Sequence, residues 1–253
     1  MRFLAILVFT VAVALPSFAA AADWGDLKMR FVYDGEPPQP KLINQRAAGA
    51  IPDESLLVNE RDRGLKNVCV WLLYGGDDPL PVHPDYAKSS TGKVTMKIAA
   101  GQFVPRIVHL QPTQTLVVSN ADSVGYDVLS HSLHNDAFNV LAPPGASFER
   151  QLKSLESSPF WLGCSIHGGL IGYVLVSDNP YGAVSDEHGN LSLANVPAGR
   201  WIFVFWHERS GYLKKVIYSG HTYDLTRGQS SLTIKPGDND LGEIKLRPEQ
   251  FRK

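Results

Sequence analysis

The chain has 253 residues, which is enough for one large or two small domains, each with its own hydrophobic core. Its 24 Lys and Arg residues nearly balance its 25 Asp and Glu residues, and the formal net charge is -1. Because no run of basic residues is present, the chain lacks the electrostatic footprint that nucleic-acid binding requires.

Residues 1–22 have the pattern of a secretory signal peptide. A positive charge at Arg2 precedes an apolar run from Leu4 to Leu15, and small residues follow from Ala19 to Ala22. The apolar run is shorter than the roughly 20 residues that a membrane-spanning helix needs, although a retained anchor stays an alternative. We therefore predict export to the periplasm or cell envelope, or secretion, with no membrane span in the mature chain.

Short apolar runs separated by Gly, Pro, Asn and Asp recur along the mature chain. The clearest runs are Leu27–Tyr33, Val68–Leu73, Leu116–Val118, Tyr173–Val176 and Trp201–Trp206. Such runs, with turn residues between them, predict an all-β protein built as a sandwich or barrel. We expect the aromatic residues of the last run to pack in a core rather than to form a sugar-binding platform.

A turn cluster at residues 177–180 ends one apolar run and marks a predicted domain border. We place one domain at residues 23–178 and a second at residues 179–253. The proline-rich stretches at residues 36–52 and 74–91 are predicted as loops or extended connections.

Residues 160–176 contain the most informative motif of the chain. A predicted strand ends at Cys164, His167 follows three residues later in a tight loop, and another strand leaves. This spacing allows a thiolate and an imidazole to bind one ion. A blue-copper centre uses one thiolate, two imidazoles and a weak axial ligand. The motif therefore predicts a copper site that includes Cys164 and His167.

At these residues the chain resembles the cupredoxins of the plastocyanin and amicyanin type. In that family a Met follows the Cys-x-x-His loop, and the second imidazole comes from an upstream His, often followed by Asn and then an aromatic residue. Here His134, followed by Asn135 and Phe138, fits that upstream element, with His131 as an alternative. The resemblance implies a Greek-key β-sandwich with Cys164, His167 and His134 as copper ligands.

Residues 24–213 also resemble a group of exported bacterial proteins described as cupredoxin-like or methylamine-utilisation-like. The matching pieces are Asp53–Leu56, Pro81–Tyr86, Gly101–Arg106, Cys164–His167 and Phe205–Glu208.

The chain departs from that group at four positions. Tyr126 stands where relatives have a His, Leu170 where they have Met, Gln102 where Cys is frequent and Arg106 where His is frequent. Only Cys164 and His167 carry over directly. If Tyr126 aligns with the family His, then His134 lies eight residues too late, and the sequence alone does not choose between the two registers.

The second cysteine, Cys69, lies in an apolar run and is predicted to be a buried thiol. A disulfide between Cys69 and Cys164 is the alternative, since export permits one. That disulfide would exclude copper at Cys164.

Residues 179–253 resemble the carboxypeptidase regulatory-like, or transthyretin-like, sandwich, whose role is usually structural or adhesive. An Asp-x-x-Gly turn at residues 186–189 and a Pro-x-Gly turn at residues 197–199 carry this resemblance. It implies a second, smaller β-sandwich and no chemistry of its own.

The leading hypothesis is a periplasmic cupredoxin-like protein that binds one copper ion and can transfer one electron to a redox partner protein. The alternative is a metal-free β-sandwich that acts as a binding or scaffold module of the cell envelope. We expect no enzymatic activity, because the sequence has no Gly-x-Ser-x-Gly, no phosphate-binding loop and no His-Glu-x-x-His.

Overall fold

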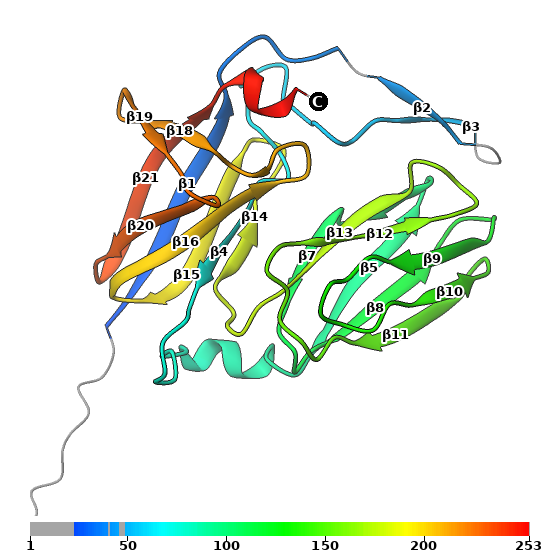
Figure 1. Cartoon of the computed structure of the whole chain (residues 1–253), viewed down its shortest axis with the longest axis horizontal. Helices are drawn as coiled ribbons and strands as arrows, with labels where there is room; N and C mark the ends of the chain where they lie inside the picture. Colours follow the sequence, from blue (N-terminus) through cyan, green and yellow to red (C-terminus); the bar gives the residue numbers. More distant parts are fainter. Residues whose placement is uncertain (1–22, 40, 46–48, 253) are drawn as a thin grey trace, which may run out of the picture.

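The structure is a computed structural model of the chain that describes residues 23–39, 41–45 and 49–252 (Figure 1). Within these ranges the chain forms 21 β-strands and two short 3-10 helices, which confirms the predicted all-β class. The predicted signal peptide, residues 1–22, lies outside the described residues. None of the helices in the described part has the length and apolar character that crossing a membrane requires.

Strands from both ends of the chain form one β-sandwich, here called the terminal sandwich, on the left in Figure 1. Its first sheet has the order β15 (Asn190–Pro197), β1 (Trp24–Tyr33), β21 (Gly237–Leu246), β18 (Lys215–Tyr218) and β19 (His221–Asp224). Its second sheet has the order β14 (Gly182–Val184), β4 (Cys69–Leu73), β16 (Gly199–His207) and β17 (Gly211–Tyr212), with β20 (Gln229–Ile234) paired to β16. Phe31 and Phe203 are fully buried in the core of this sandwich, so aromatic residues of the run 201–206 pack as predicted.

Residues 93–176 form a second sandwich, here called the central sandwich, on the right in Figure 1. One sheet has the order β10 (Asn139–Ala142), β9 (Tyr126–Ser130), β12 (Phe160–Cys164), β13 (Ile171–Val176) and β7 (Ile107–Leu110). The other has the order β11 (Ser147–Gln151), β8 (Thr115–Asn120), β5 (Lys93–Ala99) and β6 (Gln102–Val104). The chain passes repeatedly from one sheet to the other, as in a Greek key, and the predicted β-sandwich is confirmed.

Alternation along the strands explains the core of the central sandwich. In β8, every second side chain is buried, at Leu116, Val118 and Asn120. Strand β9 alternates in the same way and buries Tyr126 and Val128. Because successive side chains of a strand point to opposite faces, this period of two directs one set of side chains into a shared core.

A third apolar cluster joins the two sandwiches. Trp206 and Cys69 of the terminal sandwich pack there with Leu175 of the central sandwich. Nearby, the buried guanidinium of Arg106 donates two hydrogen bonds, of 2.5 and 2.8 Å, to the buried carboxylate of Glu208. Because breaking a buried ion pair leaves an uncompensated charge, this bidentate pair fixes the two sandwiches against each other.

The predicted border after residue 178 falls two residues beyond the last strand of the central sandwich, β13. However, β1 and β4 precede this border and pair with β15, β21 and β16, which follow it. The terminal sandwich is therefore built from segments on both sides of the central sandwich in the sequence, and the border after residue 178 does not separate the two cores.

Both stretches predicted as loops contain short elements. Residues 36–52 include an antiparallel hairpin of β2 (Leu42–Gln45) and β3 (Gly49–Pro52). Residues 74–91 include the helix η1 (Pro84–Lys88), whose N-terminus is capped by the His83 ring accepting from the N–H of Asp85. The second 3-10 helix, η2 (Pro248–Phe251), ends the chain with Phe251 buried.

Candidate functional site

The candidate site lies where β12 ends and the loop to β13 begins. Cys164 is the last residue of β12, and His167 follows in that loop. The Sγ atom of Cys164 lies 3.5 Å from Nδ1 of His167, and the backbone N–H of His167 donates to the same sulfur at 3.3 Å. A sulfur and a nitrogen that share one metal ion lie about 3.5 Å apart at typical bond lengths. The structure thus brings together the two residues that the motif predicted as a pair.

Asp127, the second residue of β9, organises this loop. Its carboxylate accepts hydrogen bonds from the Cys164 thiol (2.8 Å), from the backbone N–H groups of Ser165 (2.9 Å) and Ile166 (3.3 Å), and from the Ser165 hydroxyl. Burial opposes ionisation of Asp127, but these hydrogen bonds outweigh it and lower its pKa. Burial, and then the hydrogen bond to Asp127, raise the pKa of Cys164. The sulfur is therefore held as a thiol.

Tyr126, the first residue of β9, lies beside the imidazole of this pair. Its ring centroid is 4.8 Å from that of His167, and its side chain is fully buried. The phenol hydroxyl donates a 2.9 Å hydrogen bond to Asp122. Burial, and then this hydrogen bond, raise the pKa of Tyr126. A neutral phenol, already bonded to a carboxylate, therefore stands at the position that the resemblance assigns to a second imidazole.

The other three departures from the family pattern have structural partners of their own. Leu170, where relatives have Met, is buried in the core of the central sandwich. Gln102 donates a 3.0 Å hydrogen bond from its amide to the carbonyl of Pro52. Arg106 forms the buried pair with Glu208 that joins the two sandwiches.

His134 does not lie with Cys164 and His167. In the antiparallel pair of β9 and β12, Val128 lies opposite Cys164 and Ser130 lies opposite Leu162. Residues that follow Ser130 therefore lie progressively farther from the sulfur of Cys164. At about 3.3 Å per residue, the position after Ser130 is already about 10 Å from Val128 along the strand. The structure therefore places Tyr126, and not His134, beside His167.

His131, the alternative ligand, lies at the same distant end as His134. Its ring stacks on Trp161, with centroids 3.7 Å apart and planes 17° from parallel. The loop that follows is held by the buried carboxylate of Glu156, which accepts from the backbone N–H groups of residues 133–135 and from the amide of Asn135. Both histidines thus belong to a loop at the opposite end of the sheet.

Asp127 and Glu156 are the residues that the sequence interpretation missed. A signal existed for the first of them, because Asp127 directly follows Tyr126 as Asn follows the upstream His in the family pattern. No local pattern indicated Glu156, whose partners lie 21–23 positions away in the sequence.

The alternative of a disulfide between Cys69 and Cys164 is wrong, because both cysteines are free. Cys69 is on β4 in the cluster between the sandwiches, whereas Cys164 is at the end of β12 in the central sandwich. Burial raises the pKa of Cys69 to about 12, so this thiol behaves as a small apolar side chain, as predicted.

The donor set does not fit a blue-copper centre. Such a centre needs a second imidazole beside the thiolate and the first imidazole. Here the phenol of Tyr126, and not a second imidazole, lies beside the ring of His167, and the sulfur of Cys164 is hydrogen-bonded to Asp127. Over residues 23–39, 41–45 and 49–252, no group of three or more His, Cys, Asp or Glu side chains is arranged to hold a metal ion.

No protein-family model matches the chain, and no curated protein sequence is similar to it. Solved structures that match part of the chain include a purple cupredoxin from Nitrosopumilus maritimus, which is 23% identical over 33% of this chain and 98% of its own, with a TM-score of 0.29. An oxidised amicyanin variant is 16% identical over 36% of this chain and 88% of its own, with a TM-score of 0.31. A copper-containing nitrite reductase from Thermus scotoductus SA-01 is 16% identical over 42% of this chain and 25% of its own, with a TM-score of 0.30.

Proposed function

We propose that this chain is an exported cupredoxin-like protein of the cell envelope that serves as a metal-free binding or scaffold module. The observation that carries this proposal is the contact between the rings of Tyr126 and His167, whose centroids lie 4.8 Å apart. An electron carrier of the blue-copper type needs an imidazole at that place. We assign no enzymatic activity to the protein.

The surroundings of the sulfur support the same proposal. The hydrogen bonds to Asp127 and the buried packing of Leu170 give the loop a structure that needs no ion. The Cys164 loop is then a structural element that closes one end of the central sandwich. Binding or scaffolding would use the outer surfaces of the two sandwiches.

The experiment is copper addition followed by visible spectroscopy. The native protein should stay colourless with Cu(II), because only one imidazole lies next to the thiol. The triple variant Tyr126→His, Asp127→Asn and Leu170→Met restores the ligand set that the resemblance implies, and it should gain an intense thiolate-to-copper charge-transfer band.

His134→Ala in the triple variant is the matched control. The restored band should persist, because His134 lies at the other end of the sheet. An intense band in the native protein, lost on His134→Ala, would contradict the proposal.

A second candidate function is the holding of one copper ion, with electron transfer to a redox partner protein. It is favoured by the 3.5 Å separation between Sγ of Cys164 and Nδ1 of His167. Competition against a Cu(I) chelator tests it, because binding that disappears in Cys164→Ser and in His167→Ala would support copper holding. No binding in the native protein would leave the metal-free proposal as the better account.

A further inference from the structure

We propose that the terminal sandwich binds a phosphate-type oxyanion in a basic pocket formed by β18, β19, β21 and the helix η2. The pocket has a volume of about 470 Å³. That volume lies within the range of roughly 300–1,000 Å³ that is usual for small-molecule sites. It is in the other sandwich from Cys164, so it is independent of the function proposed above.

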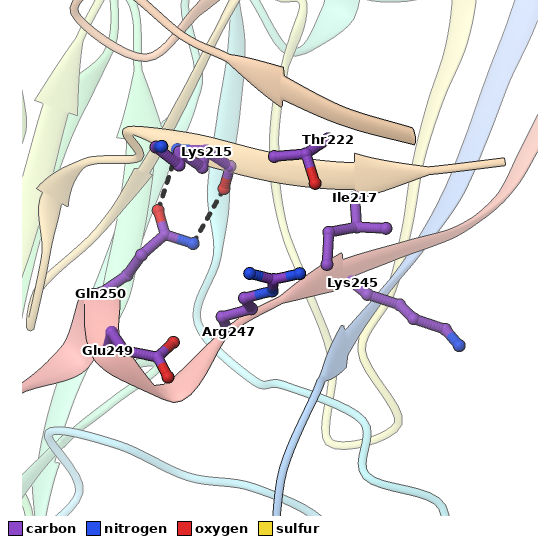
Figure 2. A pocket seen from close by; sticks show the side chains of 7 residues that line it. All are labelled: Lys215, Ile217, Thr222, Lys245, Arg247, Glu249 and Gln250. Atoms are coloured by element: carbon purple, nitrogen blue, oxygen red, sulfur yellow. Dashed lines mark hydrogen bonds between the residues drawn. The ribbon is translucent and has the colours of Figure 1, made fainter. Parts of the chain in front are cut away.

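Three cationic side chains line this pocket, from Lys215, Lys245 and Arg247. Figure 2 shows the guanidinium of Arg247 at the centre of the group, with Ile217 and Thr222 on one side and Gln250 on the other. An arginine fork suits two oxygens of a phosphate, lysine ammonium groups add point charges, and the Thr222 hydroxyl can donate a hydrogen bond. Figure 2 shows Lys245 extending away from Arg247, so the guanidinium and the Thr222 hydroxyl would contact the oxyanion while the lysines add charge around it.

The positive charge in the pocket exceeds the negative charge beside it by one, once Glu249 in the lining and Asp224 next to Lys215 are both counted. Among the described residues, neither the ammonium group of Lys245 nor the guanidinium of Arg247 has a hydrogen-bond or ion-pair partner, whereas Lys215 lies 3.3 Å from Asp224. Glu249 is the one carboxylate in the lining. The local excess of positive charge stands out in a chain whose formal net charge is -1.

Strand register places three of the lining residues in one row across β19, β18 and β21. Ile217 of β18 lies opposite Lys245 of β21 and opposite Thr222 of β19. Beyond this row the pairing of β18 with β21 stops, because the backbone N–H and carbonyl of Lys215 are hydrogen-bonded to the side chain of Gln250. The cross-strand partner of Lys215 is Asp224, which carries the opposite charge, whereas Lys245 lies opposite the apolar Ile217. A bound anion would supply the counter-charge that Lys245 and Arg247 lack within the described residues.

The pocket wall is already fixed without a ligand. The side-chain carbonyl of Gln250 accepts hydrogen bonds from the N–H groups of Lys214 and Lys215, and its amide donates to the carbonyl of Lys215 at 2.8 Å. Phe251, the next residue, is buried in the core of the terminal sandwich. Helix η2 is thereby attached to β18, so ligand binding need not order this wall.

The test is a titration of the full-length mature protein with inorganic phosphate and with glucose 6-phosphate, followed by NMR or calorimetry at constant ionic strength. Saturable binding is expected. The double variant Lys245→Gln and Arg247→Gln should weaken it by at least about tenfold, because it removes the charge-assisted hydrogen bonds. Phosphate should also raise the melting temperature of the native protein but not that of the double variant.

The control is the double variant Lys88→Gln and Lys97→Gln, which removes the same charge from exposed residues elsewhere. It should bind phosphate as the native protein does. An equal loss in both double variants, or no saturable binding by the native protein, would overturn the proposal. Without phosphate, the first variant should melt close to the native protein, because neither side chain has a hydrogen-bond or ion-pair partner among the described residues, so loss of folding is told apart from loss of the site.

A further arm identifies the source of the oxyanion. Vesicles of phosphatidylcholine with and without phosphatidylglycerol are compared for binding of the native protein and of the two double variants. Binding that depends on phosphatidylglycerol, Lys245 and Arg247 would support a lipid headgroup. Binding of the soluble phosphates alone would support a free phosphate compound as the ligand.

Discussion

Two loops at opposite ends of the central sandwich are each built around one carboxylate, but the two carboxylates hold different groups. Glu156 is buried and accepts hydrogen bonds from the backbone N–H groups of residues 133–135. Asp127 accepts from the thiol of Cys164 and from the hydroxyl of Ser165 in addition to backbone N–H groups. The first carboxylate therefore shapes a loop, whereas the second also controls the protonation of a sulfur.

The difference shows why histidines alone do not define a metal site. His131 and His134 are two histidines close together in the sequence, but they belong to the loop that Glu156 shapes. The loop with the sulfur has one imidazole, from His167, and a phenol beside it. Strand register, rather than the number of histidines, decides which side chains meet.

Acidification should have the largest effect, and it should act outside both loops. Burial lowers the pKa of His109 to about 4 and that of His207 to about 3. The unfolded chain binds these protons at pH values below about 6.5, whereas the folded protein does not, so stability falls as the pH drops from about 6.5 towards 4. With two histidines the slope approaches about 2.7 kcal/mol per pH unit.

Urea denaturation at a series of pH values measures this slope. The variant His109→Gln should remove about half of it, because one of the two neutral histidines is gone. His134→Gln, in the exposed loop, should leave the slope unchanged. A slope that depends on His134 instead would show that the loops, and not the buried parts of the sandwiches, set the acid sensitivity.

Removal of the structural carboxylate should have the next largest effect. In Glu156→Ala, three backbone N–H groups lose their acceptor, and the side-chain amide of Asn135 keeps only its hydrogen bond to the carbonyl of Ser154. Partly buried donors without partners are costly, and the buried carboxylate that holds the loop is gone, so the free energy of unfolding should fall by about 3 kcal/mol. Urea denaturation at neutral pH measures this change.

The matched control is Glu149→Ala on β11, where the carboxylate is exposed and pairs with Lys93 at the surface. That variant should cost no more than about 1 kcal/mol, as exposed ion pairs do. The Glu156→Ala variant should also leave the reactivity of Cys164 unchanged. Equal losses in the two variants would mean that Glu156 does not fix its loop.

The sequence predicted features that depend on residues close together in the chain, and it did not predict features that depend on pairing between distant segments. Short apolar runs between turn residues predicted strands of both sandwiches, because each run falls on one strand. The Cys164–His167 pair was predicted because only three positions separate the end of β12 from His167 in the loop that follows. The pairing of β1 and β4 with later strands, and the choice of Tyr126 over His134, depend on register between distant segments, which no local pattern specifies.

The smallest expected effect tests the chemical role of Asp127. The variant Asp127→Asn keeps a carbonyl oxygen for the backbone N–H groups of the loop but removes the negative charge next to the sulfur. Because the hydrogen bond to this carboxylate contributes to the raised pKa of Cys164, the pKa should fall and the thiolate fraction should grow. Alkylation by iodoacetamide at neutral pH should therefore be several-fold faster, since the thiolate is the reacting species. The same isosteric change in the other loop, Asp136→Asn, should not alter the rate. An unchanged or slower rate in Asp127→Asn would mean that burial alone holds the sulfur as a thiol, and that the two carboxylates differ only in their neighbours.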